Sequence, residues 1–510
     1  MVSITIVGGG SAGWMTAATL LSQFPNKKIT LVESPNVSNI GVGESTVAGG
    51  QAGFAGITDW FRLIDISDLD FMPHCDAIYK LSIAFKDWYR KDSGTFHYPF
   101  GVPEVQQNLH PNDWYLKKIF YPKTPVSDYA DSFYPAMSLV NQNRLDLGQA
   151  EFSYQFDATK LGIWLRDNYC KAKYSNNFTH ILAEVKETPL SENGIEHLVL
   201  DDGQKLEADL FIDCTGFKSL LLSKALDVPF TSIEDYIPNN YAWATKIPYR
   251  DPESQIVNYT NCTAIENGWI WEIPLWSRMG SGYVWSDEFV SSEEALKEFK
   301  RGLIKKGYTE VEDLEYHLVH MRCGIHEKLW VKNTCAIGLS AGFIEPLQSN
   351  GLQSIHQFLF NLCRILERGH ISEWDRREFT TKCHDDFYGF MGVVALSYLL
   401  SHRDDTPYWR EIQTRELPKD LFTKHFHQAY SRKNYGDRFD NPIIDCMTIG
   451  MNWNPIDSHV LKYKGNMSTT MKKNTDETLL YINERKKRWN EQVKNLPSPY
   501  QFLKKNIHNV

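Results

Sequence analysis

The chain has 510 residues, a formal net charge of −9 and 42% hydrophobic residues, which is the composition of a globular protein with two or three domains. The negative charge argues against nucleic acid as a partner, and no apolar run is long enough for a membrane span. Nine scattered cysteines without a CxxC pair predict reduced thiols, a cytoplasmic location and no metal site, and we expect no signal peptide because the first strand begins almost at once.

The first stretch of the chain predicts a dinucleotide-binding unit. Residues 4–7 form a short apolar strand, and Gly8, Gly10 and Gly13 follow it with G-x-G-x-x-G spacing before a helical pattern begins. These glycines allow a tight turn, a close approach of phosphate to the backbone, and close packing of the helix on the strand. A second strand ends in Glu33, twenty residues after Gly13, where a carboxylate can bind a ribose. The cofactor contacts expected here are Gly8, Gly9, Gly10, Ser11, Ala12, Gly13, Trp14, Glu33 and Ser34.

Two segments that follow this unit are ambiguous on their own. Residues 40–46 contain glycines typical either of backbone that passes close to a ligand or of a simple turn. The alternation of Leu81, Ile83 and Phe85 predicts a strand with one buried face, and Lys80 stands at its beginning. Most lysines are solvated surface groups, so this local pattern does not by itself make Lys80 catalytic. The cofactor contacts expected in the first segment are Gly43, Glu44, Ser45 and Thr46.

The middle of the chain is expected to leave the cofactor sheet and return to it. Residues 94–147 show little periodicity and are expected to form long loops and irregular structure inserted into the cofactor domain. Helical period returns at residues 157–165, and an apolar strand at residues 208–217 ends in a glycine-containing turn. Further strands are expected at residues 180–185 and 197–200, with a hairpin turn at residues 201–203. The cofactor contacts expected on these and later segments are Val185, Asp213, Gly216, Leu339 and Leu352.

A second, antiparallel sheet is expected over residues 241–289. Within it Trp269, Trp271 and Ile273 face the same way if the segment is a strand, and Pro274 follows them. These side chains form either a rigid wall of a ligand cavity or ordinary core packing. The 15 Trp, 25 Tyr and 27 Phe residues of the chain leave the same two interpretations open.

The last third of the sequence is mostly helical. A helix is expected at residues 292–305, and an apolar strand near residue 335 runs into a turn of small residues before a helix that begins at about residue 352. Backbone N–H groups at that helix start, in Asn350 and Gly351, face a potential anion. Helical patterns continue to about residue 430 and return at residues 476–506.

Apolar strands that end in glycine turns near residues 8, 216 and 338 predict a sheet that the chain visits three times. This interleaving favours FAD over NAD as the cofactor, because NAD dehydrogenases usually complete their cofactor domain in one continuous stretch. The predicted fold is an α/β FAD-binding three-layer Rossmann-like domain of the glutathione-reductase type, interleaved with a mixed sheet-plus-helix substrate domain. The FAD-binding domain is expected to comprise residues 1–90, 150–230 and 320–365, and the substrate-binding domain residues 91–149, 231–319 and 366–510.

From residue 4 to about residue 409 the chain resembles the flavin-dependent halogenases, specifically the tryptophan-halogenase-like group. Residues 8–14 are similar to their GGGxAGW motif, residues 41–46 to GVGE[AS]T, residues 269–274 to WxWxIP, and residues 403–409 to RxDTxFW. In that family a lysine opens the strand that ends eight residues later in an Asn/Asp-Trp pair, and Lys80 has this relation to Trp88. The resemblance therefore implies that Lys80 is catalytic and that Trp269, Trp271, Ile273 and Pro274 form a wall of the active site.

The resemblance implies a function as well as a fold. Reduced FAD, O2 and a halide ion produce hypohalous acid, which passes through an internal tunnel to the lysine and then halogenates an electron-rich aromatic ring. Burial lowers the pKa of a lysine and favours the neutral amine that forms a haloamine. The implied partners are a small aromatic substrate, a separate flavin reductase and further copies of the chain in a homo-oligomer. The implied halide contacts are Asn350 and Gly351.

One position departs from the family pattern. Tryptophan halogenases read Pro-Leu-Glu-Ser-Thr-Gly where this chain has Gln348 in place of the glutamate and Asn350 in place of the threonine. That glutamate is thought to stabilise the cationic ring intermediate, and a glutamine carries no charge and is no comparable base. Glu345, three residues earlier, matches a glutamate that the family also has, with an expected structural role. Gln348 thus predicts an activated phenol or indole as substrate, with bromide or iodide favoured over chloride.

Two other functions fit parts of the pattern. An FAD-dependent aromatic hydroxylase would share the cofactor domain but would require neither halide nor Lys80, so halide dependence of the product separates the two. A non-catalytic flavin-binding protein would explain the altered turn at Gln348, but the intact Lys80 and WxWxIP motif argue against it.

Overall fold

The structure is a computed structural model that describes residues 2–36, 44–45, 56–104, 111–148, 150–416, 442–453 and 469–509. Gly43 and Thr46, two of the expected cofactor contacts, lie outside the described residues, as does most of the segment 40–46. Glu44 and Ser45 are described as a short strand.

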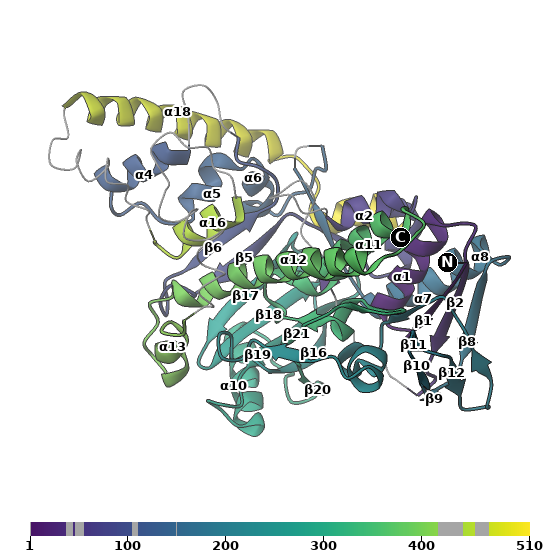
Figure 1. The fold of residues 1–510 in the computed structure, drawn as a ribbon. Helices are drawn as coiled ribbons and strands as arrows, with labels where there is room; N and C mark the ends of the chain where they lie inside the picture. Colours follow the sequence, from purple (N-terminus) through teal and green to yellow (C-terminus); the bar gives the residue numbers. More distant parts are fainter. Residues whose placement is uncertain are drawn as a thin grey trace.

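A six-stranded sheet holds the N-terminal unit (Figure 1). Five of its strands are parallel and come from separate parts of the sequence, as the interleaved pattern predicted. Parallel strands are covered on both faces, which explains their continuous apolar sequences. In sheet order the strands are β22 (Trp330–Val331), β23 (Thr334–Ala336), β14 (Leu210–Asp213), β1 (Ser3–Val7), β2 (Lys28–Glu33) and β8 (Phe178–Leu182).

The glycine turn after β1 is required by backbone contacts. Gly8 has a φ of +119°, and a Cβ atom there would lie 2.2 Å from the carbonyl oxygen of Cys214. Helix α1 (Ser11–Gln23) crosses so close to the turn that a Cβ on Gly13 would lie 1.8 Å from the carbonyl oxygen of Gly8. The predicted strand, turn and helix are therefore confirmed, and the spacing of the glycines follows from this close packing.

A seven-stranded sheet lies beside the first and confirms the second sheet expected from the sequence (Figure 1). It is antiparallel except for one parallel pair, β17 with β5. Residues 82–85 of β5 are all buried, whichever face they point to, so the expectation of one buried face was wrong, because other parts of the chain cover both faces of the sheet here. In sheet order the strands are β20 (Tyr316–His320), β16 (Tyr241–Pro248), β19 (Arg278–Trp285), β18 (Gly268–Pro274), β17 (Tyr259–Ile265), β5 (Ser82–Lys86) and β6 (Thr95–Pro99).

Smaller sheets connect the two large ones. The sheet most relevant to the site places β4 (Ile78–Lys80) and β3 (Glu44–Ser45) on either side of β7 (Ser153–Phe156). Since β4 directly precedes β5, the chain passes from this small sheet into the seven-stranded sheet at Lys80. The remaining small sheets are β15 (Phe230–Ser232), β21 (Gly324–His326) and β24 (Gly342–Phe343); β13 (Lys205–Leu206), β12 (Leu198–Leu200) and β9 (Val185–Glu187); and β10 (Leu190–Ser191) with β11 (Gly194–Ile195).

Helices cover both large sheets and the space between them (Figure 1). The long helices α11 (Asn350–Leu366) and α12 (Glu373–Leu399) run across the middle of the molecule, and α10 (Ser292–Lys305) packs on the seven-stranded sheet. The other α-helices are α2 (Ile57–Leu63), α3 (Asp68–Phe71), α7 (Ala158–Trp164), α8 (Lys171–Lys173), α9 (Pro252–Gln255), α13 (Pro407–Ile412), α16 (Pro442–Gly450), α18 (Thr469–Val493) and α19 (Pro499–Leu503).

The stretch 94–147 differs from the expectation of long loops. It contains β6 and three helices, α4 (Pro111–Phe120), α5 (Asp128–Phe133) and α6 (Ala136–Asn141), which lie under α18 (Figure 1). The sequence signal was missed because two of the helices are only six residues long and are buried on several sides. A buried helix shows no regular alternation of polar and apolar faces.

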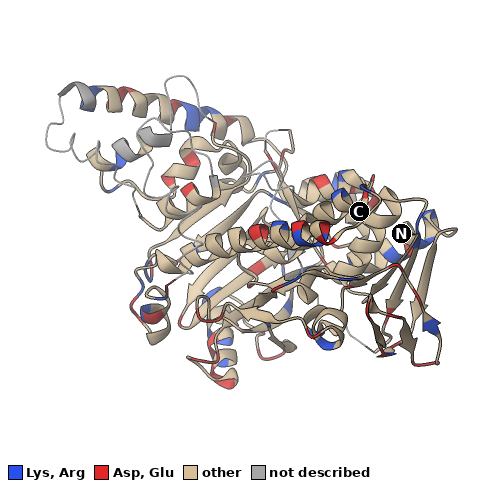
Figure 2. Ribbon diagram, in the orientation of Figure 1, with Lys and Arg blue, Asp and Glu red and all other residues tan. Residues whose placement is uncertain are grey.

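Surface charge and thiols agree with the composition. Acidic and basic residues alternate along the helices and outer loops, while the strands of the seven-stranded sheet are mostly uncharged (Figure 2). Each of the nine cysteines is buried as a thiol. Within the described residues, no helix combines the length and the apolar character needed to cross a membrane.

The close contact of α1 with the glycine turn makes a stability prediction. Gly13→Ala should destabilise the protein by about 3 kcal/mol, because the new methyl group overlaps the carbonyl oxygen of Gly8. Gly162→Ala, also inside a helix, is the matched control: its Cβ would lie 3.4 Å from the Trp14 ring, and helix propensity favours alanine by roughly 0.5–1 kcal/mol. Urea unfolding of both variants measures the difference, and equal stabilities would contradict the packing.

Candidate active site

Three glycine-containing turns meet at the carboxyl ends of the parallel strands. The turn at Gly8 follows β1, the turn at Gly216 follows the neighbouring β14, and the turn at Gly338 follows β23. Gly338 touches the start of α1, since a Cβ there would lie 2.7 Å from the Cβ of Ala12. Ligands of open α/β sheets bind at the carboxyl ends of the strands. This edge therefore has the geometry of a nucleotide site.

The acidic residue at the end of β2 lies against the glycine turn. A Cβ on Gly9 would lie 2.3 Å from the Cγ of Glu33, so the two are in direct contact. The Glu33 carboxylate is 2.8 Å from the Nε2 of His180, which leaves its second oxygen on the side of Gly9. Trp14 is buried and packs edge-on against His180, the partner of Glu33, so its contribution is packing.

The buried Asp213 supports the second turn rather than an open edge. One carboxylate oxygen accepts hydrogen bonds from the N–H and hydroxyl of Thr215, and the other accepts from the N–H groups of Leu221 and Leu222. Burial raises the pKa of Asp213, and these hydrogen bonds oppose that shift. Among the other expected contacts, Gly216 and Leu339 lie on adjacent turns, Leu352 is buried in α11, Val185 begins β9, and the Ser34 hydroxyl contacts Glu184.

The edge suits the pyrophosphate and ribose of FAD. The turn from Gly8 to Ala12 is half-buried, and α1 begins there with its free N–H groups. Helix starts attract phosphate through these N–H groups and the helix dipole. The residues present therefore fit the cofactor that the sequence pattern predicted.

Lys80 is fully buried at the junction of two sheets. It is the last residue of β4, and its exposed fraction is 0%. The ammonium nitrogen lies 3.3 Å from the hydroxyl of Ser349 and 5.4 Å from the centre of the Phe100 ring. Burial lowers the pKa of Lys80 to about 7, so a substantial fraction of neutral amine exists near neutral pH.

The contact of Lys80 lies in a turn with unusual backbone. Gln348 and Ser349 both have positive φ, 65° and 55°, and Asn350 returns to helical values as the first residue of α11. Consecutive left- and right-handed conformations turn neighbouring N–H groups toward one point, which forms an anion-binding nest. The nest coincides with the N-terminus of a 17-residue helix, so both features favour an anion near Asn350 and Gly351.

The side chain of Asn350 makes its hydrogen bonds within the turn itself. Its amide nitrogen donates to the carbonyl oxygens of Glu345 and Leu347, at 2.6 Å and 2.8 Å. It therefore ties the turn together instead of reaching toward an anion. Only the backbone N–H groups of Asn350 and Gly351 are placed to bind one.

A buried carboxylate anchors the same turn. Glu345 accepts hydrogen bonds from the amide of Asn239 and the hydroxyl of Tyr398, at 2.8 Å and 2.7 Å, and Tyr408 donates to the Asn239 carbonyl. Burial raises the pKa of Glu345 to about 7 despite these donors. Since both oxygens of Glu345 are occupied, the expected structural role fits its geometry.

The tryptophans expected to form a wall share one face of β18. The ring centres of Trp269 and Trp271 are 6.1 Å apart, and Trp88 contacts Trp269 at the same distance. This face points to the interior shared with Glu345, and Ile273 lies on it as well. Pro274 does not: by strand alternation it faces the other side, where it lines a separate pocket with Met279. The expectation for Pro274 is corrected accordingly.

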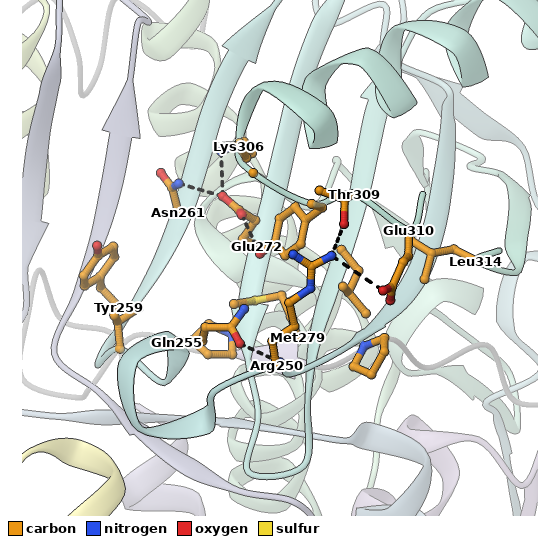
Figure 3. A pocket seen from close by; sticks show the side chains of 16 residues that line it. Arg250, Gln255, Tyr259, Asn261, Glu272, Met279, Lys306, Thr309, Glu310 and Leu314 are labelled. Carbon is orange, nitrogen blue, oxygen red and sulfur yellow. Dashed lines mark hydrogen bonds and ion pairs between the residues drawn. The ribbon is translucent and has the colours of Figure 1, made fainter. Parts of the chain in front are cut away.

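That separate pocket has a volume of about 280 Å³ and opens on the outer face of the seven-stranded sheet (Figure 3). At its base Lys306 pairs with Glu272 at 2.6 Å, and Glu272 also accepts from Asn261 and Tyr308. The sheet itself separates the pocket from Lys80. This pocket is thus distinct from the buried lysine site.

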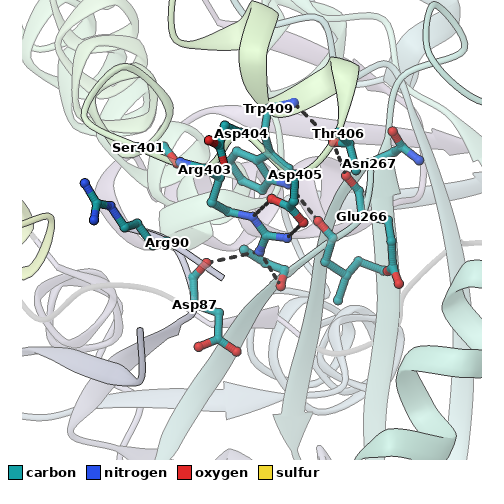
Figure 4. A network of polar contacts seen from close by, with 12 residues as sticks. Asp87, Arg90, Glu266, Asn267, Ser401, Arg403, Asp404, Asp405, Thr406 and Trp409 are labelled. Carbon is teal, nitrogen blue, oxygen red and sulfur yellow. Dashed lines mark hydrogen bonds and ion pairs between the residues drawn. The ribbon is translucent and has the colours of Figure 1, made fainter. Parts of the chain in front are cut away.

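The segment similar to RxDTxFW forms a structural clamp (Figure 4). Arg403, 3% exposed, binds both oxygens of Asp405 and donates to the carbonyl oxygens of Asp87 and Ala264. Trp409 stacks on its guanidinium and donates to the Ile265 carbonyl. The clamp joins the region after α12 to the ends of β5 and β17, and so the motif acts on the strands rather than in the site.

Several residues near Lys80 were not singled out from the sequence. The Phe100 ring lies under the Lys80 ammonium, and the thioether of Met447 lies 3.5 Å from the amide nitrogen of Gln348. Phe100 and Met447 belong to segments without clear periodicity, so no local signal could have found them.

Comparisons with known proteins agree with this geometry. The family model described as tryptophan halogenase matches residues 3–463. Tryptophan 6-halogenase SttH of Streptomyces toxytricini is 34% identical over 449 residues, which is 82% of this chain and 82% of that protein. Tryptophan 7-halogenase RebH of Lentzea aerocolonigenes is 30% identical over 425 residues, covering 80% and 78%. The apo structure of VirX1 is 31% identical, with a TM-score of 0.88 over 100% of this chain and 99% of that one.

The buried Lys80 makes a prediction about stability and pH. In the unfolded chain its pKa returns to about 10.5, so between pH 7 and 10.5 the unfolded state binds more protons than the folded state. The free-energy cost of burying Lys80 on folding therefore falls as pH rises. Lys80→Met should therefore be more stable than the wild type at neutral pH. This advantage should shrink by about 1.4 kcal/mol per pH unit toward pH 10.

Urea unfolding at several pH values measures this difference. Lys86→Met, at the exposed end of β5, is the matched control for loss of a lysine. A difference between Lys80→Met and the wild type that stays constant with pH would show that burial leaves the Lys80 pKa unchanged.

Proposed function

The chain belongs to the tryptophan halogenase family of flavin-dependent enzymes, and we propose that it halogenates an electron-rich aromatic compound at Lys80. The observation that carries the proposal is the burial of Lys80 beside the turn at the start of α11. Reduced FAD, bound along the glycine edge, would supply hypohalous acid from O2 and halide. A separate flavin reductase would supply the reduced cofactor.

The glycine edge is the proposed place for FAD. Gly8 to Gly13 and the N-terminus of α1 would hold the pyrophosphate, and Glu33 would hold a ribose. Glu44 and Ser45, two of the proposed cofactor contacts, form β3 in the same small sheet as β4, the strand that ends in Lys80. We propose the cofactor and substrate domains with the boundaries expected from the sequence, except that residues 82–86 pair within the seven-stranded sheet.

Lys80 would act on the oxidant and the ring. As an ammonium it donates a hydrogen bond to hypohalous acid and polarises the halogen, and as a neutral amine it forms a haloamine. A pKa of about 7 makes both forms available at neutral pH. Burial at 0% exposure keeps water from hydrolysing either species. The halide would bind at the backbone N–H groups of Asn350 and Gly351.

Gln348 sets the proposed substrate and halide preference. It is 8% exposed and lies within the turn that Glu345 anchors, yet it has no charge with which to stabilise a ring cation. Losing one such contact removes roughly 2–4 kcal/mol of transition-state stabilisation. Phenols and electron-rich indoles form their cations more easily, and bromide and iodide are oxidised more easily than chloride. We therefore propose these substrates and these halides, with free tryptophan and chloride as poorer ones.

The first test concerns Lys80. Lys80→Met should lower the rate of halogenation by about 100-fold or more, because the oxidant no longer meets a donor or nucleophile beside the ring. Reduced flavin should still be consumed. Product mass and oxygen consumption measure the two rates, with Lys86→Met as control. Full halogenation by Lys80→Met would remove Lys80 from the mechanism, and a hydroxylated product made without halide would identify a hydroxylase.

The second test concerns Gln348. With chloride and bromide at equal concentrations, the wild type should brominate a phenol in preference to chlorinating tryptophan. Gln348→Glu should raise tryptophan chlorination by roughly 30-fold or more, if the missing charge is responsible. Gln348→Leu, uncharged, is the control and should not. Predominant tryptophan chlorination by the wild type would contradict the proposed preference.

A further inference from the structure

A thioether lies inside the proposed site without a role in the proposed reaction. Met447 is on α16, has an exposed fraction of 0%, and its sulfur accepts a hydrogen bond from the amide nitrogen of Gln348 at 3.5 Å. A sulfur atom accepts but does not donate, so the amide nitrogen is the group that must face it. The hydrogen bond engages one lone pair of the sulfur and leaves the other available.

Two chains of contacts connect Lys80 to the region of α16, one of them to Met447 and the other to Gly450. The first runs through the turn: Lys80 lies 3.3 Å from Ser349, and Ser349 directly follows Gln348. The second runs along β6, which carries Phe96 and Tyr98. Lys80 lies over the Phe100 ring, and Phe100 packs against Tyr98 with ring centres 5.8 Å apart. Two residues before Tyr98, Phe96 contacts Gly450 of α16. Both end on α16, so this helix packs against residues that themselves contact or neighbour Lys80.

Because Met447 is buried, its oxidation would indicate an oxidant formed inside the protein. Thioethers are oxidised readily to sulfoxides, but Met447 is shielded from bulk water. Met279 offers a comparison, because it is 6% exposed and lines the pocket on the outer face of the seven-stranded sheet. An oxidant dissolved in bulk water reaches Met279 first. An oxidant released at Lys80 meets only buried groups, among them the Cys262 thiol, which lies close enough to Lys80 to act on its charge, and Met447 beside Gln348.

We propose that Met447 is a modification site, converted to the sulfoxide by hypohalous acid that has found no aromatic substrate. The proposal rests on the proposed function. In the step a sulfur–oxygen bond forms and the oxygen–halogen bond breaks. The sulfur is oxidised by two electrons, the halogen is reduced to halide, and the proton of hypohalous acid is released.

The product changes the packing of the site. The sulfoxide oxygen is a strong acceptor, and it adds a polar atom to the buried face of α16 beside Gln348. An added atom in a filled interior shifts its neighbours. Turnover without substrate therefore removes excess hypohalous acid at Met447 and also lowers later activity. Reduction of the sulfoxide restores the thioether.

The test is peptide mass analysis of the full-length enzyme after turnover. Every sample contains FAD, a flavin reductase and catalase. One sample has bromide and no phenol, a second has bromide and a phenol, and a third has neither bromide nor phenol. In the sample with bromide and no phenol, the fraction of Met447 peptide that gains one oxygen should be at least about tenfold larger than in the bromide-free sample. Met279 should stay unmodified in both. With phenol, bromophenol should form and Met447 should be protected.

The control variant is Met447→Leu, which has no sulfur to oxidise. After turnover without phenol it should keep a larger share of its own starting activity than the wild type does. Bromophenol formation with an unmodified Met447 in the phenol-free sample would overturn the inference while the proposed function stands. Equal oxidation of Met279 would also overturn it, and so would modification in place of Met447 at the buried thiol of Cys262, which lies close to Lys80, or at that of Cys446, the residue before Met447. Absence of both bromophenol and sulfoxide would overturn the proposed function, and the inference with it.

Discussion

The burial of the Lys80 ammonium is the constraint on which the rest of the structure depends. A charged amine in an apolar interior is unfavourable, and the chain reduces that penalty by lowering the pKa of Lys80 to about 7 and by offering the Ser349 hydroxyl. This position exists only because β4 ends one sheet and β5 begins another. A lysine within a single sheet edge would reach solvent.

The turn at the start of α11 is held by buried hydrogen bonds of residues other than Lys80. Glu345 is fixed by Asn239 and Tyr398, and the Asn350 side chain closes the loop on the carbonyls of Glu345 and Leu347. With its shape maintained in this way, the turn keeps two residues at positive φ. The backbone N–H groups and Gln348 therefore face the site while the anchoring groups stay buried.

The residues that hold the large sheets together are different from the residues around Lys80. The clamp of Arg403 fixes the end of β5, next to Trp88, and Ala264 of β17, which pairs with Trp269 of β18, and the glycine contacts fix α1 against β1. Neither touches Lys80. The site itself combines β4, the turn before α11 and α16, which come from three distant parts of the chain.

The sequence by itself determined the elements whose causes are local. The strand, glycine turn and helix at residues 3–23 could be predicted because sterics at Gly8 and Gly13 require that spacing, and the alternation of Trp269 and Trp271 set their common face. It also placed Lys80 at a strand boundary. Only the tertiary structure decided that Lys80 is buried, that Asn350 turns inward, that Pro274 faces the opposite side, and that Met447 meets Gln348. Those outcomes depend on contacts between residues far apart in sequence, for which a single chain carries no local signal.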